Sequence, residues 1–390
     1  MPIARDFLQT FGRSSLSGEP WVLTGHILTY ARDHHGISVE KFFESGLDIE
    51  AFHSDVEARL IAAFARLRTD EKAQLDVMSM HATYVQLVSV FAATINLIQN
   101  GPVSEAHKNL AKCLGATDAV VTFNWDTLMD RALSETSDWS TEFGYGFQPW
   151  RIYRNGWETP DGDNAQAAPT LLKLHGSSNW LTGYLIPDYE NYSLSLVQAA
   201  PADRVHVFES TLDPYPTWKG RFMPGYERFS YGYYPPHLPD DPGKSAPKGW
   251  VFVQGSYNFP WMPKGKASDE GLVSSPLIIP PVQKKTYELF GGLFDRIWQQ
   301  AADALTQADE IVLIGYSFPV TDVHSLELFK RALCQRTSIP KVTLVDPNPD
   351  RAFNVLAQDC GIPRSSIRVF SGSDGYFSAT FDTARLWSSP

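Results

Sequence analysis

Short apolar runs that stop abruptly at polar residues mark the first predicted elements. The β-branched run at residues 119–123 stops at Asn124 and Asp126, and the leucine-rich run at 171–174 stops at His175. Runs of this kind are typical of buried parallel strands, which deliver side chains to one edge of a sheet. Because open α/β sheets bind ligands along that edge, we expect these three polar side chains to meet at the mouth of one crevice.

The last third of the chain alternates apolar runs with helical patterns. It predicts strands at 276–280, 310–315, 341–345 and 366–370, and helices at 287–307, 322–336 and 350–359. This alternation implies right-handed crossovers between parallel strands. The predicted fold class is therefore α/β, a doubly wound (Rossmann-like) parallel sheet with an inserted helical region and an aromatic and proline-rich insertion.

Two stretches interrupt this alternation. Apolar positions recur at helical spacing from residue 38 to residue 100, which predicts helices at 39–44, 49–67 and 71–99. Residues 187–275 are rich in Tyr, Pro, Gly and Trp and too broken for long helices, which predicts an irregular insert or lid, packed on the domain or stacking a ligand. The predicted division is a Rossmann-like unit at 1–36 and 115–390, a helical insertion at 37–114, and the insert at 187–275 within the main unit.

Composition narrows the class of protein. The 390 residues are 43% hydrophobic, contain no run of 18 apolar residues and do not begin with a secretion signal pattern, so we expect a cytoplasmic protein without membrane association. A formal net charge of -11 argues against direct nucleic-acid binding. The three cysteines, Cys113, Cys334 and Cys360, are far apart and form no CxxC pair, so we expect neither a disulfide framework nor a zinc site.

Three predicted strand ends of the last third carry residues suited to a nucleotide. Gly315 and Ser317 can offer a backbone N–H and a hydroxyl to phosphate, and Asp346 and Asn348 can bind ribose hydroxyls or a base edge. Ser373 follows the third of these strands. The sequence therefore predicts a nucleotide site along this edge.

Helix capping is the alternative explanation at several of these positions. Asp322 and Asp350 directly precede predicted helices, where an aspartate is a good N-cap, and we expect capping at both. Asp126 also lies directly before a helix, so a capping role and a catalytic role are both open. A histidine at a strand end, such as His175, can likewise serve only to bind backbone.

Four segments in this order resemble the motifs of the sirtuin-like superfamily. They are FNWDTL at 123–128, KLHGSSNW at 173–180, GYSFPVTD at 315–322 and LVDPNP at 344–349. The resemblance is closest to the bacterial branch found in anti-phage defence operons and covers roughly residues 1–380. The resemblance implies that NAD is the substrate. The chain lacks the four-cysteine zinc module of other sirtuins, as that branch does, so the resemblance also implies that no zinc is bound.

The family also has an N-terminal Gly-Ala-Gly-x-Ser-x-x-x-Gly-x-Pro loop that cradles the pyrophosphate of NAD. Gly12, Ser14 and Gly18 match its second glycine, its serine and its third glycine, which makes them candidate cofactor-binding residues. Thr10 and Phe11 replace the first glycine and the alanine, and their side chains would crowd a phosphate. A surface loop rich in Ser and Gly is the alternative reading of residues 10–20.

The resemblance implies an NAD hydrolase, which splits NAD into nicotinamide and ADP-ribose. By carry-over, Asn124 orients the ribose and the attacking water, His175 acts as base toward the ribose hydroxyls, and Asp126 belongs to the same motif. Because uncontrolled activity would deplete the cell of NAD, we expect the enzyme to be held off until a homo-oligomer forms or a separate protein from a defence operon binds.

A binding module is the competing function. With Thr10 and Phe11 in its loop, a catalytically impaired sirtuin-like subunit would serve as a nucleotide-binding sensor or as a scaffold in a defence complex. Asn124 and His175 favour the hydrolase, whereas the altered loop favours the sensor. Protein deacylation would need an acyl-lysine tunnel, and no segment of the sequence indicates one.

Overall fold

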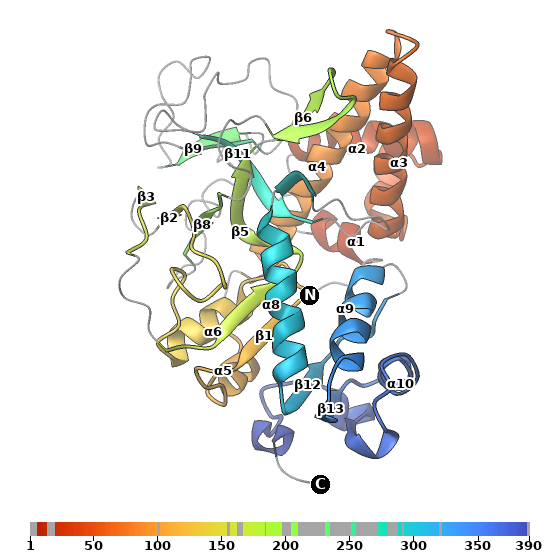
Figure 1. Cartoon of the computed structure of the whole chain (residues 1–390). Helices are drawn as coiled ribbons and strands as arrows, with labels where there is room; N and C mark the ends of the chain where they lie inside the picture. Colours follow the sequence, from red (N-terminus) through yellow and green to blue (C-terminus); the bar gives the residue numbers. More distant parts are fainter. Residues whose placement is uncertain are drawn as a thin grey trace.

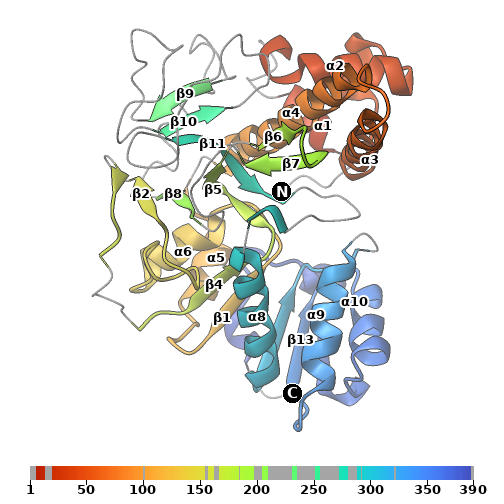
Figure 2. The ribbon, with the colours of Figure 1, turned by 45° about the horizontal axis from the view of Figure 1, so that its top comes forward.

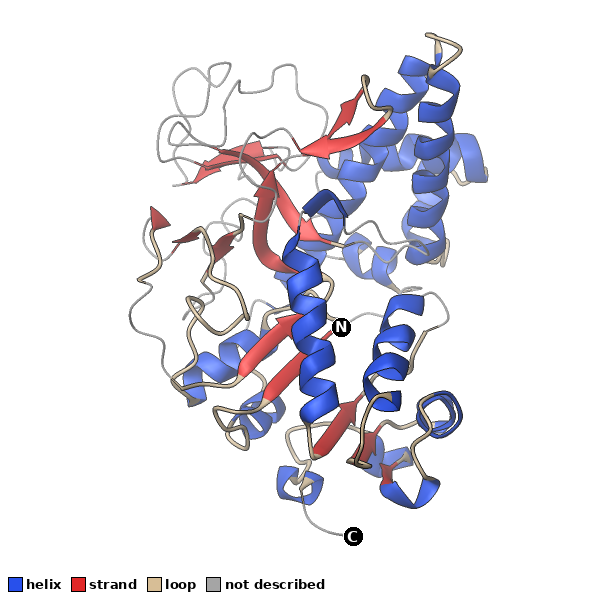
Figure 3. Ribbon diagram, in the orientation of Figure 1, coloured by secondary structure: helices blue, strands red, loops and turns tan. Residues whose placement is uncertain are grey.

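The computed structural model of this chain is a mixed α/β structure with small parallel sheets (Figure 1). It describes residues 6–13, 20–99, 102–153, 157–161, 167–183, 185–196, 204–209, 231–234, 251–254, 272–279, 288–290, 292–319 and 322–387. Figure 3 shows one group of helices at the upper right, whereas the other helices lie among the strands. No helix within these ranges combines the length and the apolar character needed to cross a membrane.

Two parallel sheets carry the strand ends that matter for function. In the first, β1 (Ala119–Thr122) pairs with β4 (Thr170–Lys173). In the second, the order is β12 (Glu310–Ile314), β13 (Lys341–Val345) and β14 (Ile367–Phe370), all parallel and in continuous register. The strands predicted at 310–315, 341–345 and 366–370 are confirmed, as are the helices α8 at Gly292–Gln307 and α9 at Val323–Cys334.

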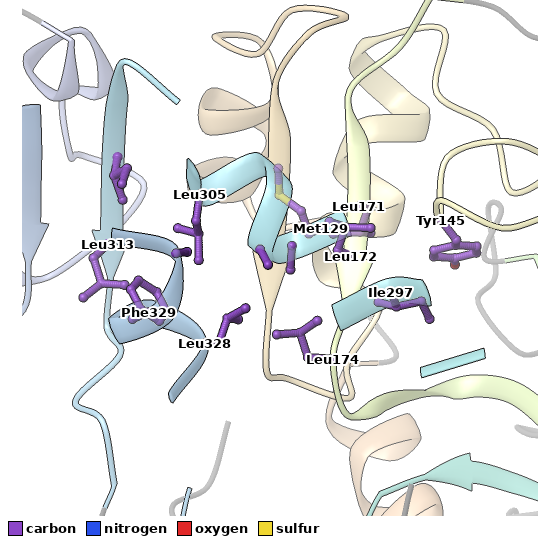
Figure 4. Close-up of a cluster of buried hydrophobic side chains, with 14 of the residues drawn as sticks. Met129, Tyr145, Leu171, Leu172, Leu174, Ile297, Leu305, Leu313, Leu328 and Phe329 are labelled. Carbon is purple, nitrogen blue, oxygen red and sulfur yellow. The ribbon is translucent and has the colours of Figure 1, made fainter. Parts of the chain in front are cut away.

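Helix α8 lies between the two parallel sheets and joins them into one core. Its apolar residues recur three or four positions apart, so a single stripe of the helix is buried. Figure 4 shows Ile297 and Leu305 of this stripe among side chains from β4, β12 and α9. One apolar cluster therefore spans both sheets, although among the described residues no strand ladder connects them.

A larger, mostly antiparallel sheet was not predicted. Its order is β3-β2-β8-β5-β11-β10-β9, with bounds Trp157–Glu158, Arg151–Tyr153, His206–Phe208, Gly176–Gly183, Leu272–Ile278, Val251–Gln254 and Tyr231–Tyr234. The strand predicted at 276–280 begins earlier and pairs antiparallel with β5, so its assignment to the parallel sheet was wrong. The described parts of the predicted irregular insert are short strands, which include the hairpin partner β7 (Ser193–Leu196) of β6 (Leu185–Asp188).

The helical region forms a separate apolar cluster (Figure 2). Its elements are α1 (Phe7–Gly12), α2 (Pro20–His35), the 3-10 helix η2 (Val39–Glu44), α3 (Ile49–Leu67) and α4 (Ala73–Gln99). The three helices predicted from residue 38 to residue 100 are confirmed within two residues. Helices α1 and α2 pack in this cluster, although the sequence assigned residues 1–36 to the Rossmann-like unit.

The remaining helices are short and lie beside the parallel sheets. Helix α5 (Glu105–Ala111) packs against α6 (Leu128–Thr136), on the β1 side, rather than in the helical cluster. The others are η3 (Glu288–Phe290), α10 (Asp350–Asn354), a π-type turn η4 (Val355–Asp359), η5 (Arg364–Ser366), η6 (Gly372–Gly375) and η7 (Thr383–Leu386). Helices η6 and η7 follow β14, and Leu386 of η7 packs in a small apolar cluster with Val345 of β13 and Phe370 of β14.

Candidate functional site

Ring contacts bring the ends of three parallel strands together. Phe123, which follows β1, stacks on Tyr316, which follows β12, with ring centroids 4.2 Å apart and an interplanar angle of 15°. The Phe123 ring also lies 5.4 Å from the imidazole of His175, which follows β4. The carboxyl ends of β1, β4 and β12 therefore meet at one place, although they belong to two different sheets.

The imidazole of His175 is buried beside a carboxylate. Its Nε2 lies 3.6 Å from Oδ2 of Asp322, and the two side chains are only 6% and 4% exposed. The same Oδ2 accepts a hydrogen bond of 2.9 Å from the hydroxyl of Tyr316. A separation of 3.6 Å is longer than a hydrogen bond, so the pair interacts electrostatically. An imidazole with a nearby carboxylate is a suitable general base.

Asp322 has a second role in the fold. Its Oδ1 accepts from the backbone N–H of Ser325 at 3.4 Å, which confirms the predicted N-cap of α9. One carboxylate thus caps the helix and faces the histidine. Sequence reasoning missed this residue as a member of the site because capping alone explained it. Its place at the end of the GYSFPVTD motif was the signal that could have identified it.

Asn124 lies at the end of β1 with its side chain exposed. Its neighbours point to different parts of the protein, since Phe123 packs toward Tyr316 whereas Trp125 packs against the helical cluster. The indole Nε1 of Trp125 donates to the carbonyl of Ile279 at 3.1 Å, which fixes this turn. The backbone N–H of Asn124 donates to Oγ1 of Thr122 at 3.1 Å, whereas within the described part of the chain its side-chain amide makes no hydrogen bond and is available to a ligand.

Asp126 supports its own turn. Its Oδ1 accepts from the backbone N–H of Leu128, the first residue of α6, at 3.0 Å, although the N-cap position of this helix is Thr127 and not Asp126. Its backbone carbonyl accepts from the buried ammonium of Lys173. Burial lowers the pKa of His107, and the negative charge of Asp126 opposes that shift. A catalytic role for Asp126 stays a prediction.

A buried polar network that the sequence did not reveal lies under this turn. Nζ of Lys173 is 3.0 Å from Oδ2 of Asp130, and both side chains are almost completely buried. Tyr145 donates to the other oxygen of Asp130 at 2.5 Å, and the Asn179 amide donates to the Tyr145 hydroxyl at 3.2 Å. Paired in this way, the buried charges hold β4, β5 and α6 together.

The glycine after His175 has a structural reason. Gly176 has φ of 78°, in the left-handed region, and a Cβ at this position would lie 2.1 Å from the carbonyl oxygen of Leu277. Only glycine lets the start of β5 approach β11 this closely. The His-Gly pair of the motif thus combines a candidate catalytic side chain with a backbone position that no other residue fits.

The turn after β12 has an unusual backbone. Gly315 and Phe318 both have positive φ, 63° and 52°, and Phe318 is buried and precedes a proline. Nε of Arg351 donates to the Phe318 carbonyl at 2.6 Å, which helps to hold the turn. A non-glycine residue in this conformation persists only where its surroundings impose it, and such positions cluster at functional sites. Ser317, inside this turn, is exposed.

The other predicted nucleotide-binding residues lie along the same edge of the three-stranded sheet. Asp346 follows β13, and its Oδ1 accepts from the backbone N–H of Asn348 at 2.7 Å. Ser373 lies in η6, directly after β14, and like Asn348 it is exposed. Asp350 was wrongly predicted as an N-cap, because α10 begins at Asp350 itself and no side chain caps it.

The predicted phosphate loop begins inside a helix. Residues Phe7–Gly12 form α1, and the ring of Phe11, which is 0% exposed, packs 5.8 Å from that of Phe43. A Cβ at Gly12 would lie 2.7 Å from Cβ of Phe43, so close helix packing explains this glycine. The loop prediction was therefore wrong from Thr10 to Gly12. The predicted residues Ser14 and Gly18 lie outside the described residues.

In the described ranges no group of three or more His, Cys, Asp or Glu side chains is arranged to hold a metal ion. A scan against models of protein families and a search of curated proteins found no match to this chain. The functional interpretation therefore rests on the residues, their geometry and the resemblance of the four motifs.

Proposed function

We propose that this protein is an NAD hydrolase of the sirtuin-like type, which splits NAD into nicotinamide and ADP-ribose. The observation that carries the proposal is the meeting of three strand ends at His175, through the stacked Phe123 and Tyr316 rings and the nearby Asp322. Three motifs of the resemblance, which are distant in the chain, supply these groups. We further propose that the activity is held off until a protein partner or self-association triggers it.

We propose that the two parallel sheets are halves of one doubly wound arrangement. The shared apolar cluster around α8 and the common direction of the strand ends toward His175 support this interpretation. In such folds the ligand binds where the halves meet, at the carboxyl ends of the strands. NAD would therefore lie across the ends of β1, β4 and β12, with the edge from Gly315 to Ser373 available to its nucleotide part.

The chemistry requires a developing positive charge on the ribose to be stabilised. As the bond between nicotinamide and the anomeric carbon breaks, the bonding electrons leave with nicotinamide, and water attacks the resulting oxocarbenium-like carbon. Asn124 would orient this water and the ribose. His175 would hydrogen-bond the ribose hydroxyls and accept the proton that the attacking water loses as its oxygen bonds to the anomeric carbon, and would release it to solvent, so that one proton is produced per NAD. Asp322 would hold the imidazole in place.

The proposal is tested by nicotinamide release from NAD. Asn124→Ala and His175→Ala are each expected to lower turnover about 100-fold to 10,000-fold, the usual contribution of a positioned acid–base group. His34→Ala, which changes an exposed histidine on α2, is the matched control and should keep wild-type activity. All three variants should keep the wild-type fold by circular dichroism, although His175→Ala, which truncates a buried side chain, should unfold at a lower temperature. Full activity in either site variant would show that the site is assigned wrongly.

A nucleotide-binding sensor or scaffold is the second candidate. The observation that favours it is the helical segment at Thr10–Gly12, with the Phe11 ring buried, where the family's phosphate loop would begin. Calorimetry of the same proteins with NAD separates the two functions. Two results together would favour the sensor. One is that His175→Ala still binds NAD; the other is that the wild-type protein does not cleave NAD, even when its partner is present.

A further inference from the structure

The last residue of helix α4 contacts the turn that carries Asn124. Oε1 of Gln99 accepts from the backbone N–H of Thr127 at 2.7 Å and from its hydroxyl at 3.2 Å. Nε2 of Gln99 donates to the hydroxyl of Ser178 at 3.2 Å. The backbone carbonyl of Gln99 accepts from the guanidinium of Arg131 at 2.9 Å. Gln99 and Thr127 are buried, so these bonds connect α4 with the β1–α6 turn and β5 away from water.

A second contact joins the same two elements. The ring of Trp125, next to Asn124, lies 5.6 Å from the ring of Phe91. Phe91 belongs to α4 and is buried in the helical cluster. Two residues of the four-residue turn at 124–127 are thus held by α4, one through packing and one through hydrogen bonds. Asn124 lies between Trp125 and the Phe123 ring that touches His175.

A second glutamine, nearer the middle of α4, joins this helix to α2. Oε1 of Gln86 accepts from the backbone N–H groups of His26 and Ile27 in α2, at 2.8 and 3.2 Å. With a rise of about 1.5 Å per residue, this anchor lies about 20 Å from Gln99 along the helix. A continuous α-helix therefore connects α2 with the turn at the candidate site.

We propose that Gln99 is a positioning residue, through which the helical region fixes the orientation of the turn that presents Asn124 to the site. Its catalytic consequence rests on the proposed hydrolase function, whereas the structural coupling stands independently. Loss of the Gln99 amide leaves the buried N–H of Thr127 without its partner, and the turn must move to satisfy it. A displacement of about 1 Å at a reacting group can lower a rate by about 100-fold.

Gln99→Met tests the coupling, because methionine keeps the length of the side chain but removes its hydrogen bonds. We expect hydrogen–deuterium exchange, followed by mass spectrometry, to rise about tenfold or more in peptides covering residues 123–130 and to stay unchanged in α3. An unpaired buried N–H costs less than the usual stability of a domain, so the variant should fold. Gln99→Glu, which keeps the oxygen acceptors for Thr127, should restore the protection.

Gln86→Met is the matched control. It removes the anchor on α2, so exchange should rise around His26 and Ile27 and stay at the wild-type level in residues 123–130. In nicotinamide release, Gln99→Met should lower kcat about tenfold or more with KM changed less than about threefold, whereas Gln86→Met should leave kcat unchanged.

Two results would overturn the coupling. One is wild-type exchange of the turn in Gln99→Met; the other is an equal fall of kcat in Gln99→Met and Gln86→Met. Absence of NAD cleavage by the wild-type protein would instead count against the hydrolase, and the exchange comparison would still decide whether Gln99 holds the turn.

Discussion

At the scale of single residues, one carboxylate serves both the fold and the candidate site. Asp322 caps α9 through one oxygen and faces His175 and Tyr316 through the other. Strand-end reasoning predicted Asn124 and His175 because each directly follows an apolar run. It could not predict that Asp322 lies beside His175, since that contact depends on how two sheets pack.

The two roles of Asp322 can be separated by substitution. Asp322→Asn keeps one oxygen as acceptor for the Ser325 N–H, puts an NH2 group in place of the oxygen that faces Tyr316 and His175, and removes the negative charge. We expect nicotinamide release to fall about tenfold or more, with an unchanged melting temperature. Asp322→Ala should also lose the cap, and its free energy of unfolding should fall by about 1 kcal/mol. Wild-type turnover in Asp322→Asn would mean that the carboxylate serves only the fold.

At the scale of elements, boundaries followed the local apolar period wherever one existed. Helices η2 and α3 and strand β13 match their predicted bounds, because each has a clear period and a distinct start. The segment at Phe7–Gly12 was misread because its apolar residues have helical spacing, whereas the loop interpretation relied on the glycines and serines after it. The antiparallel sheet was missed because most of its strands are too short to show a period.

The approach of β5 to β11 gives a prediction at this scale. Gly176→Ala would put a Cβ 2.1 Å from the Leu277 carbonyl, in addition to the strain of φ at 78°. Gly361→Ala is the matched control, because φ there is 72° but no atom lies within 4 Å of the added carbon. We expect the control to lose about 1–2 kcal/mol of unfolding free energy in denaturant titration and Gly176→Ala clearly more. Equal losses would mean that β5 can shift away from β11.

At the scale of the whole molecule, buried histidines make stability depend on pH. His53 and His81 are 0% exposed, and burial lowers the pKa of His53 to about 3 and that of His81 to about 4. In the unfolded chain both histidines would have a pKa of about 6.5. The unfolded state therefore binds more protons below that pH, and the free energy of unfolding should fall as the pH drops from about 6.5 toward 4, by up to about 1.4 kcal/mol per pH unit for each histidine.

His53→Phe isolates one of these contributions. Both ring nitrogens of His53 lack a hydrogen-bond partner among the described residues, and its ring stacks on Phe91. Phenylalanine keeps the stacking and removes the buried nitrogens, so we expect higher stability at pH 7 by about 1–3 kcal/mol and a weaker pH dependence. Urea titrations at pH 7 and pH 5 measure both effects. An unchanged difference between the two pH values would show that His53 is accessible to protons in the folded state.

The general architecture was partly accessible from the sequence. The parallel strands of the last third and the helical region were predicted, because each forms from consecutive residues with a regular apolar pattern. The membership of α1 and α2 in the helical cluster, and the pairing of β11 with β5, depend on contacts between segments far apart in the chain. No local pattern encodes such contacts.

The two parallel sheets share no ladder among the described residues, and at the candidate site they meet through side chains, chiefly the Phe123–Tyr316 stack and the His175–Asp322 pair. A molecule bound there would touch both halves at once. When the free ligand concentration is about 100 times the dissociation constant, binding at a single site adds about 2.7 kcal/mol to the stability of the folded state. Under the proposed hydrolase function, bound NAD would thus connect the two parallel sheets and stabilise the folded protein. Each turnover would remove this connection.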